Sequence, residues 1–203
     1  MSEKPKFAFG DLEDAAQDRA RRDLLCEMLK LPWHEKATAQ FISDAEKAGV
    51  NVIPGSVRFS KDSASFSASD VNLPVVLDRS GIGRKFLDAS EIYELFCACA
   101  TARIYQVYPD SPSAQLLSVS VEISFLDSDD GRAVALCDIA ANQLEQYLKN
   151  FAVTLSVHLH RLIAAEYERI ASRSFLDGIL ETMGTVFEEN GNGEMSIPLR
   201  KGW

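Results

Sequence analysis

The sequence has few histidines, and none of them stands in a catalytic context. Its 203 residues include three: His34, His158 and His160. A serine, cysteine or threonine nucleophile needs a neighbouring base, and no spacing here matches a known nucleophile-histidine arrangement. The run Trp33-His34-Glu35-Lys36 lacks the second histidine, four residues on, that a zinc-binding helix requires. We therefore predict no catalytic residue, metal or cofactor from motifs.

The chain also lacks an excess of positive charge and a long hydrophobic run. Twenty-one lysines and arginines against thirty aspartates and glutamates give a net charge of −9, which repels nucleic acid and anionic lipid. No apolar run approaches the roughly 20 residues that span a bilayer. Residues 1–6 carry no apolar core of a signal peptide. We expect a cytoplasmic protein that binds neither nucleic acid nor membrane.

Cysteine is present without any spacing typical of a metal or disulfide site. The four cysteines have no C-x-x-C pair among them and lie in or beside apolar segments. They are predicted to be reduced thiols in the core: Cys26, Cys97, Cys99 and Cys137.

Hydrophobic residues make up 46% of the chain, enough for a substantial core. The clearest pattern is the alternation from Leu117 to Phe125, which predicts a strand with one polar face. Turn residues from Asp127 to Gly131 follow, and Ala133 to Ile139 is predicted to be the partner strand. This hairpin, Leu117 to Ile139, is the expected centre of the fold.

Helices are predicted on both sides of this hairpin. The first two run from Asp11 to Lys30 and from Trp33 to Ala48, where Gly49 supplies a left-handed stop, and we expect them to form a helical pair. A capping box at Asp88-Ala89-Ser90-Glu91 begins another helix that continues to Ile104. Short strands are expected at 57–59, 64–68 and 75–77, the last because Pro74 is disfavoured inside a strand.

Residues 151–160 fit two periodicities. They alternate like a strand, and they also continue an apolar stripe that begins at Leu144. We favour a helix, because no glycine or proline interrupts 140–173. In a helix His158 and His160 point about 200° apart, so they cannot share a metal, and His158 is expected at a helix seam with a carbonyl or carboxylate partner.

A final amphipathic helix is predicted from Ser174. The predicted domain limits are a flexible arm (1–10), one α+β domain (11–173), this helix (174–188) and a disordered tail (189–203). Because its apolar face lies outside the core elements, we predict that it forms a partner interface. The residues of this face are Phe175, Leu176, Ile179, Leu180, Met183 and Phe187.

The segment from Asp78 to Lys85 is the one candidate ligand loop. Its glycines expose backbone N–H groups and its two adjacent cations suit a phosphate. It resembles the D-x-S-x-x-G element of PilZ domains at Asp78, Ser80 and Gly83, which implies cyclic-dinucleotide binding, although the R-x-x-x-R arm of that family is represented only by Arg58. The predicted ligand-binding residues are Asp78, Ser80, Gly81, Gly83, Arg84 and Lys85.

The order of predicted elements resembles that of class I type III secretion chaperones. The resemblance rests on the acidity of the chain and on the passage from Leu117, through Asp129-Asp130-Gly131-Arg132, to the stripe from Leu144 to Leu155. It implies an α+β fold, an antiparallel sheet with a central hairpin packed against several helices, and a homodimer that holds a segment of a protein client. A partner-binding protein of chaperone or adaptor type is therefore the first functional hypothesis, a small-ligand sensor the second and an enzyme without a recognisable motif the third.

Overall fold

The computed structural model describes residues 5–80, 100–107, 118–125 and 131–193. The fold is α+β, as predicted, with an antiparallel sheet and helices on both sides of it in the sequence. Contacts divide the chain into two compact units. We call Met1–Lys36 with Ile163–Trp203 the terminal unit, and Ala37–Leu162 the central unit.

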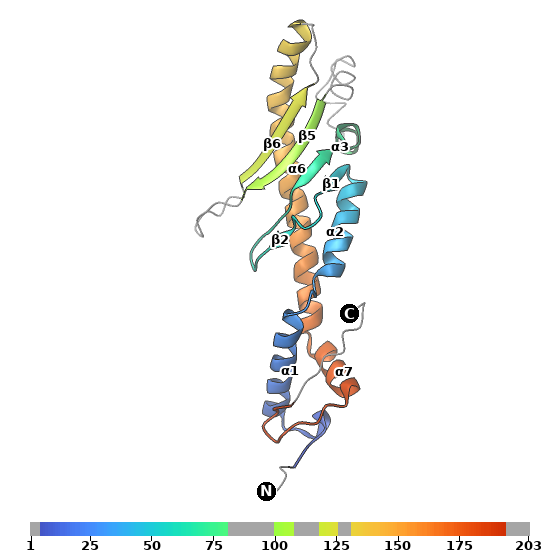
Figure 1. Cartoon of the computed structure of the whole chain (residues 1–203), viewed down its shortest axis with the longest axis vertical. Helices are drawn as coiled ribbons and strands as arrows, with labels where there is room; N and C mark the ends of the chain where they lie inside the picture. The colour runs from blue at the N-terminus through green and yellow to red at the C-terminus, as the bar shows by residue number, and fades with distance from the viewer. Residues whose placement is uncertain (1–4, 81–99, 108–117, 126–130, 194–203) are drawn as a thin grey trace. The chain divides into compact units, whose positions relative to one another are not determined.

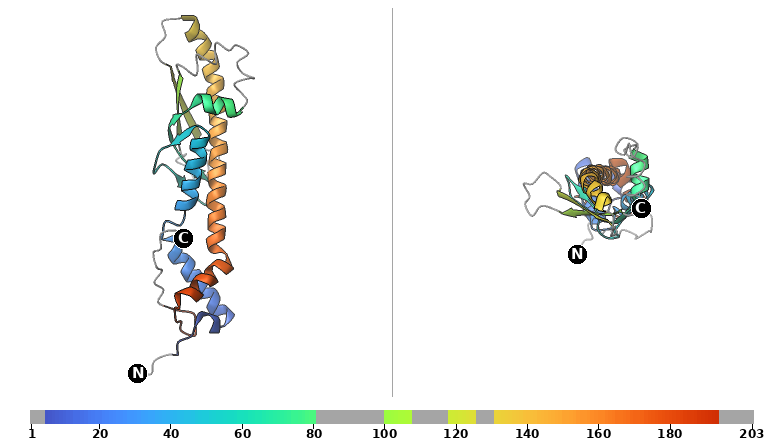
Figure 2. Two further views of the ribbon diagram at one scale, coloured as in Figure 1. Left: turned by 90° about the vertical axis from the view of Figure 1, so that its right-hand side faces the viewer. Right: turned by 90° about the horizontal axis from the view of Figure 1, so that it is seen from above.

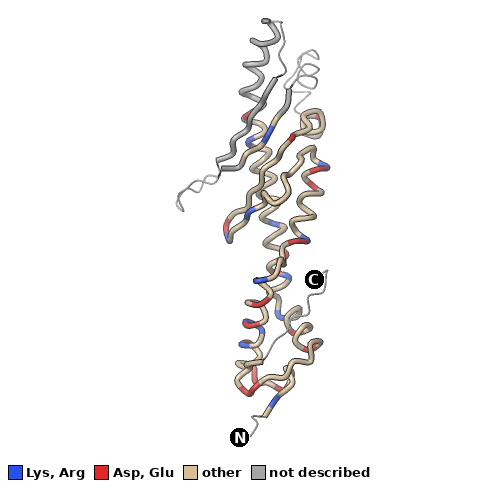
Figure 3. The backbone as a smooth tube through the Cα atoms, in the orientation of Figure 1, with Lys and Arg blue, Asp and Glu red and all other residues tan. Residues whose placement is uncertain are grey.

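The terminal unit is helical. It contains a 3-10 turn (η1, Phe9–Asp11), helix α1 (Asp14–Leu29), the end of the long helix α6 (Gly131–Ala171) and helix α7 (Arg173–Met183). The Ser172 side chain caps α7 by accepting a hydrogen bond from the Phe175 amide, and Gly184 ends it at φ 59°. Three arginines lie among four Asp and Glu residues along α1 (Figure 3), so neither sign of charge dominates it.

One stripe of α1 and one face of α7 form the core of this unit. On α1 the buried positions repeat every four residues, and the two alanines among them let the helices approach closely. The stripe consists of Ala16, Ala20, Leu24 and Met28, and the facing residues include Ile170, Leu176, Ile179, Leu180 and Phe187.

Both ends of the described chain join this core, which corrects two predictions. Phe7 and Phe187 exchange backbone hydrogen bonds of 2.9 Å, and Phe9 is buried with its ring 6.2 Å from that of Phe187. Gly191 (φ 84°) is buried against Ala16, whose carbonyl oxygen would lie 2.3 Å from an added Cβ. Residues 7–10 are therefore not a loose arm, and 189–193 are not a disordered tail, because backbone pairing and a glycine-only approach hold both in place.

The central unit is built on a four-stranded antiparallel sheet in the order β1-β4-β5-β6. Its strands are β1 (Val50–Val52), β4 (Ala68–Val71), β5 (Ala100–Val107) and β6 (Ser118–Phe125), and a separate pair consists of β2 (Arg58–Phe59) and β3 (Ala64–Ser65). Figure 1 shows β6 as the outermost strand, with α6 running along one face of the sheet, and Figure 2 shows the same layering from the side.

Helix α2 (Glu35–Lys47) packs on this unit through Phe41, whose ring lies 5.2 Å from that of Phe66. Gly49 follows α2 at φ 86°, which confirms the predicted left-handed stop. The two predicted N-terminal helices are thus both present. Each packs inside its own unit, α1 on α7 and α2 in the central unit, and their pairing stays a prediction.

The strand predicted at Leu117–Phe125 is confirmed as β6, but its partner differs from the prediction. β6 pairs with β5 in one unbroken register from Ala100 opposite Phe125 to Val107 opposite Ser118. Residues 133–139, predicted as the partner strand, belong to helix α6. Their sequence, Ala-Val-Ala-Leu-Cys-Asp-Ile, is short and apolar, and its alanines and leucine favour a helix as much as the valine and isoleucine favour a strand. Helix α6 also confirms the helical interpretation of 151–160.

Two further predictions near the sheet are wrong. Residues 75–77 lie in helix α3 (Leu73–Ser80), which Asn72 begins by accepting a hydrogen bond from the Val75 amide at 3.3 Å. Pro74 sits in the first turn of this helix, where a missing N–H costs little. The helix predicted to reach Ile104 is wrong from Ala100 onward, because Ala100–Val107 is β5; its capping box at 88–91 lies outside the described residues.

Candidate functional site

The predicted ligand loop is only partly visible. Asp78 and Ser80 lie on helix α3 rather than in a loop. Gly81, Gly83, Arg84 and Lys85 lie outside the described residues. The phosphate-binding role of this loop stays a prediction.

The apolar face that is predicted to bind a partner is buried within the terminal unit. Leu176, Ile179, Leu180 and Phe187 are at most 5% exposed, and Phe175 and Met183 are partly buried against the same cluster. These side chains pack on α1 in the terminal unit. The premise that the face needs an external partner is therefore wrong. Its partner within the chain, α1, lies too far away in the sequence to be predicted from local patterns.

The two histidines of α6 make separate contacts on separate neighbours. His158 Nε2 lies 3.2 Å from Asp44 Oδ2 on α2, and His160 Nε2 lies 3.1 Å from the carbonyl oxygen of Lys61 in the turn between β2 and β3. His158 is thus a seam histidine with a carboxylate partner, as predicted. Neither histidine has a second metal-ligating partner, and the described part of the chain contains no group of three such side chains that could hold an ion.

Asp44 has two further partners on its own helix besides His158. The Gln40 amide donates to Asp44 Oδ1 at 2.9 Å, and Lys47 Nζ lies 3.6 Å from the same oxygen. The hydrogen bonds from Gln40 and then His158 lower the pKa of the Asp44 carboxyl below its usual range. The pair is half-exposed, and no nucleophile contacts it within the described residues, so we assign it the role of fixing α2 to α6 in the central unit.

This contact gives a pH-dependent stability that can be measured. Because the folded-state pKa of Asp44 is depressed, its stabilising effect is present above the unfolded pKa of about 4 and disappears as the pH falls through the lower folded value. Asp44→Asn should lower the melting temperature at pH 7, and the difference from the wild type should shrink as the pH falls below 4. Glu46→Gln, an exposed change on the same helix, is the control and should show no such convergence. A difference that stays constant down to pH 3 would contradict this assignment.

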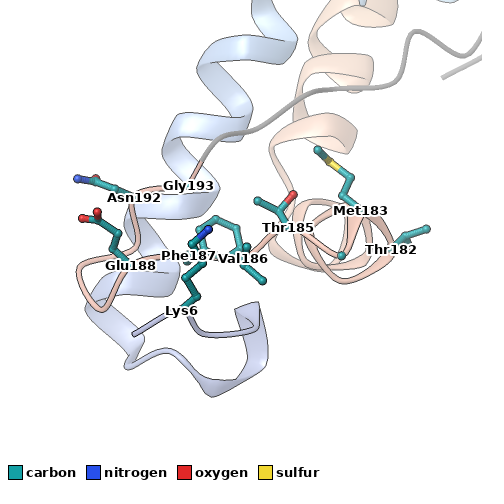
Figure 4. A pocket seen from close by; sticks show the side chains of 10 residues that line it. Lys6, Thr182, Met183, Thr185, Val186, Phe187, Glu188, Asn192 and Gly193 are labelled. Atoms are coloured by element: carbon teal, nitrogen blue, oxygen red, sulfur yellow. The ribbon is translucent and has the colours of Figure 1, made fainter. Parts of the chain in front are cut away.

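A surface depression in the terminal unit is lined by few charged side chains. It has a volume of about 870 Å³ and is lined by Lys6 and by residues from Thr182 to Glu188 with Asn192 and Gly193. Figure 4 shows Thr182 and Met183 at one end of it and Glu188 and Asn192 at the other. One cation and one carboxylate face an open hollow, and none of the buried polar side chains of the described chain lines it. We do not place the functional site there.

The two edges of the four-stranded sheet differ sharply. The β1 edge is three residues long and has a register shift between Asn51 and Val52. Short length and irregular pairing are devices that protect an edge strand from unwanted pairing. This edge is therefore poorly suited to strand addition.

The β6 edge has none of these protections. Strand β6 spans eight residues, pairs with β5 without a register shift, and contains no proline, lysine or arginine. Glu122 is its single charge, and the register places it opposite Arg103. Among the described residues no strand pairs with the other side of β6. We call this row of backbone groups the β6 edge and take it as the candidate site.

Comparison with known proteins adds no identity. No protein-family model matches the chain, no curated protein matches it in sequence, and no solved structure matches it. The resemblances to secretion chaperones and to the PilZ element therefore stay predictions. In the part of the chain that the structure describes, no helix has the length and hydropathy to cross a bilayer.

Sequence reasoning identified β6 but missed why it matters. The alternation at 117–125 is visible in the sequence, and the register agrees with it. Val121 lies opposite Ile104, and Ile123 lies opposite Ala102. On β5, Ile104 and Ala102 are each 1% exposed, whereas Arg103 and Tyr105 are exposed. With 133–139 as its partner strand, the sequence would not have shown which strand forms the edge of the sheet. A detectable signal was the β-branched and aromatic content of Thr101 to Val107, which favours a strand.

The four cysteines cannot be treated as one group. Cys26 is free, as predicted, but it is exposed on α1 rather than buried in the core. The reason is its place on the helix, two residues beyond Leu24 and so off the buried stripe.

Proposed function

We propose that this chain is a non-enzymatic partner-binding protein of chaperone or adaptor type, and that it binds an extended protein segment along the β6 edge. The observation that carries this proposal is the contrast between the two ends of one sheet: β1 is short and irregular, whereas β6 is long and regular and has no second strand partner among the described residues. An open edge of this length is otherwise a risk of aggregation, so its retention favours a use for it.

Strand addition suits this edge physically. Outward-pointing backbone groups alternate along an antiparallel strand, so about four of the eight residues offer both an N–H and a C=O to a partner. These bonds supply affinity without demanding a particular sequence, while alternate side chains of the partner supply selectivity. The net charge of −9 favours protein partners over nucleic acid or anionic membrane.

We propose the cytoplasm as its compartment. The unpaired thiol of Cys26 on an exposed helix surface is consistent with a reducing environment.

Two proline substitutions test whether the β6 edge binds a partner. Inward and outward amides alternate, so one of Ser120→Pro and Val121→Pro removes a bond to β5 and the other removes an outward N–H. The variant that loses a bond to β5 should lower the melting temperature by several degrees. The variant that loses an outward N–H should lower it much less, which identifies the outward position. The outward variant should then lose most of the proteins that the tagged wild-type chain captures from native lysate.

The lysate experiment has its own control and a clear contrary result. Ser69→Pro alters β4, an interior strand, and should unfold the sheet, which shows what non-specific loss looks like. A well-folded outward variant that captures the same proteins in the same amounts as the wild type would show that β6 is not the binding surface.

A further inference from the structure

We infer that the segment paired with the β6 edge is β6 of a second copy of this chain, antiparallel, with Val121 opposite Val121. The inference rests on the proposed use of the β6 edge: a second copy occupies the edge when no client is bound, and a client segment competes with it. It joins two four-stranded sheets into one continuous sheet across a two-fold axis.

The sequence of β6 selects this register. Three antiparallel registers pair nearly the whole strand. Placing Val121 opposite Glu122 pairs positions of opposite parity, so the polar face of one copy would continue the apolar face of the other. Placing Glu122 opposite Glu122 sets two carboxylates against each other, which destabilises a pair. Only the register centred on Val121 avoids both faults.

That register is also self-complementary along its length. It pairs seven residues of each copy, from Ser118 opposite Ser124 to Ser124 opposite Ser118. Val119 lies opposite Ile123 and Val121 opposite itself, a run of β-branched pairs that suits a sheet. Glu122 lies opposite Ser120, whose hydroxyl can donate to a carboxylate. The strand is therefore complementary to a second copy of itself.

The geometry of the unit agrees with such pairing. In an antiparallel edge-to-edge pair of the same parity, equivalent faces of the two sheets lie on the same side. Helix α6 runs along one face of the sheet (Figures 1 and 2), so in the pair both copies of α6 lie on one side of the joined sheet. The single carboxylate of β6 adds no like-charge contact at the seam, although each copy carries a net charge of −9.

Charge substitutions at Ser120 give a test with opposite signs. Ser120→Glu places carboxylates opposite Glu122 at two symmetric positions and should weaken dimerisation, whereas Ser120→Lys places ammonium groups there and should strengthen it. Each change should move the dimer dissociation constant by roughly two- to thirtyfold. Ser69→Glu, an exposed change on the interior strand β4, should leave the constant unchanged. Sedimentation equilibrium of the full chain, compared with its mass of 22.4 kDa, measures all four proteins.

A cysteine pair tests the register itself. Directly opposite residues have Cα atoms about 4.5 to 5.5 Å apart, within the range of a disulfide, so Val121→Cys should give a covalent dimer under mild oxidation. In the same register the two copies of residue 123 lie about 13 Å apart along the strands, so Ile123→Cys should not cross-link through that position. Mass spectrometry of the linked peptide separates this bond from links through native cysteines.

The outcomes separate this inference from the proposed function. A wild-type chain that is monomeric at 100 μM, or a dimer that Ser120→Glu and Ser120→Lys leave unchanged, overturns the second-copy assignment. If the outward proline variant still loses captured proteins in that case, the edge binds a client instead and the proposed function stands. If a dimer forms as described but capture is unaffected by any β6 variant, self-pairing holds and the proposed client role fails.

Discussion

Replacing Phe187 with alanine should lower the free energy of unfolding of the terminal unit by about 3 to 5 kcal/mol, the usual cost of removing a buried phenyl ring. Phe187 is fully buried, its ring lies 6.2 Å from that of Phe9, and its backbone pairs with Phe7. Such a loss is a large share of the 5 to 15 kcal/mol typical of a domain. Urea unfolding followed by circular dichroism measures it, and hydrogen exchange in α1 and α7 localises it.

The neighbouring residue supplies the matched control for Phe187. Val186 is 50% exposed, so Val186→Ala should change stability by less than about 0.5 kcal/mol. Equal effects of the two substitutions would show that the segment after α7 is not part of the core.

Arg21→Ala should destabilise the same unit by about 3 kcal/mol, near the lower end of the range for breaking a buried ion pair. The Arg21 side chain is 9% exposed and donates from Nε and Nη2 to the two oxygens of Asp177, at 2.5 and 3.2 Å. It also donates to Asp18 and Gln17, and its guanidinium lies 5.3 Å from the centre of the Phe9 ring. Its removal leaves the Asp177 carboxylate partly buried, with Arg173, at 4.0 Å, as a weak and exposed remaining partner.

Two variants frame the Arg21 result. Arg22→Ala removes an exposed arginine one position along the same helix and should cost less than about 0.5 kcal/mol. Arg21→Lys keeps the charge but loses the two-pronged geometry, so its cost should fall between the two. An Arg21→Ala protein as stable as Arg22→Ala would mean that the ion pair contributes nothing.

Local sequence patterns predicted correctly those elements that have a single dominant local cause. The alternation at 117–125, the uninterrupted stripe through 140–173 and the glycine after α2 each have one dominant physical cause, and each is confirmed by β6, α6 and the left-handed Gly49. Residues 75–77 and 133–139 are short apolar runs whose period fits two structures, so neighbours decide between them. At 75–77 the deciding neighbour was the Asn72 cap, and at 133–139 it was continuity with the longer helix.

Long-range pairing was beyond the reach of those patterns. The sequence shows that α1 and α7 each have an apolar face, but not that these faces contact each other. The candidate site shares this property: β6 was predicted as a strand, yet its place at the edge follows from β5 being its partner on one side and from the absence of another strand partner within the described ranges. Edge or centre is a property of the assembled sheet.

The order of synthesis follows from the discontinuous make-up of the terminal unit. Asp177 is made 156 residues after Arg21, which at about 5 to 20 residues per second means a wait of roughly 8 to 30 s on the ribosome. During that interval the whole of Ala37–Leu162 emerges and has its own core to form, while the stripe of α1 has not yet met α7. The nascent chain therefore carries an uncovered apolar helix until α7 and Phe187 have been translated.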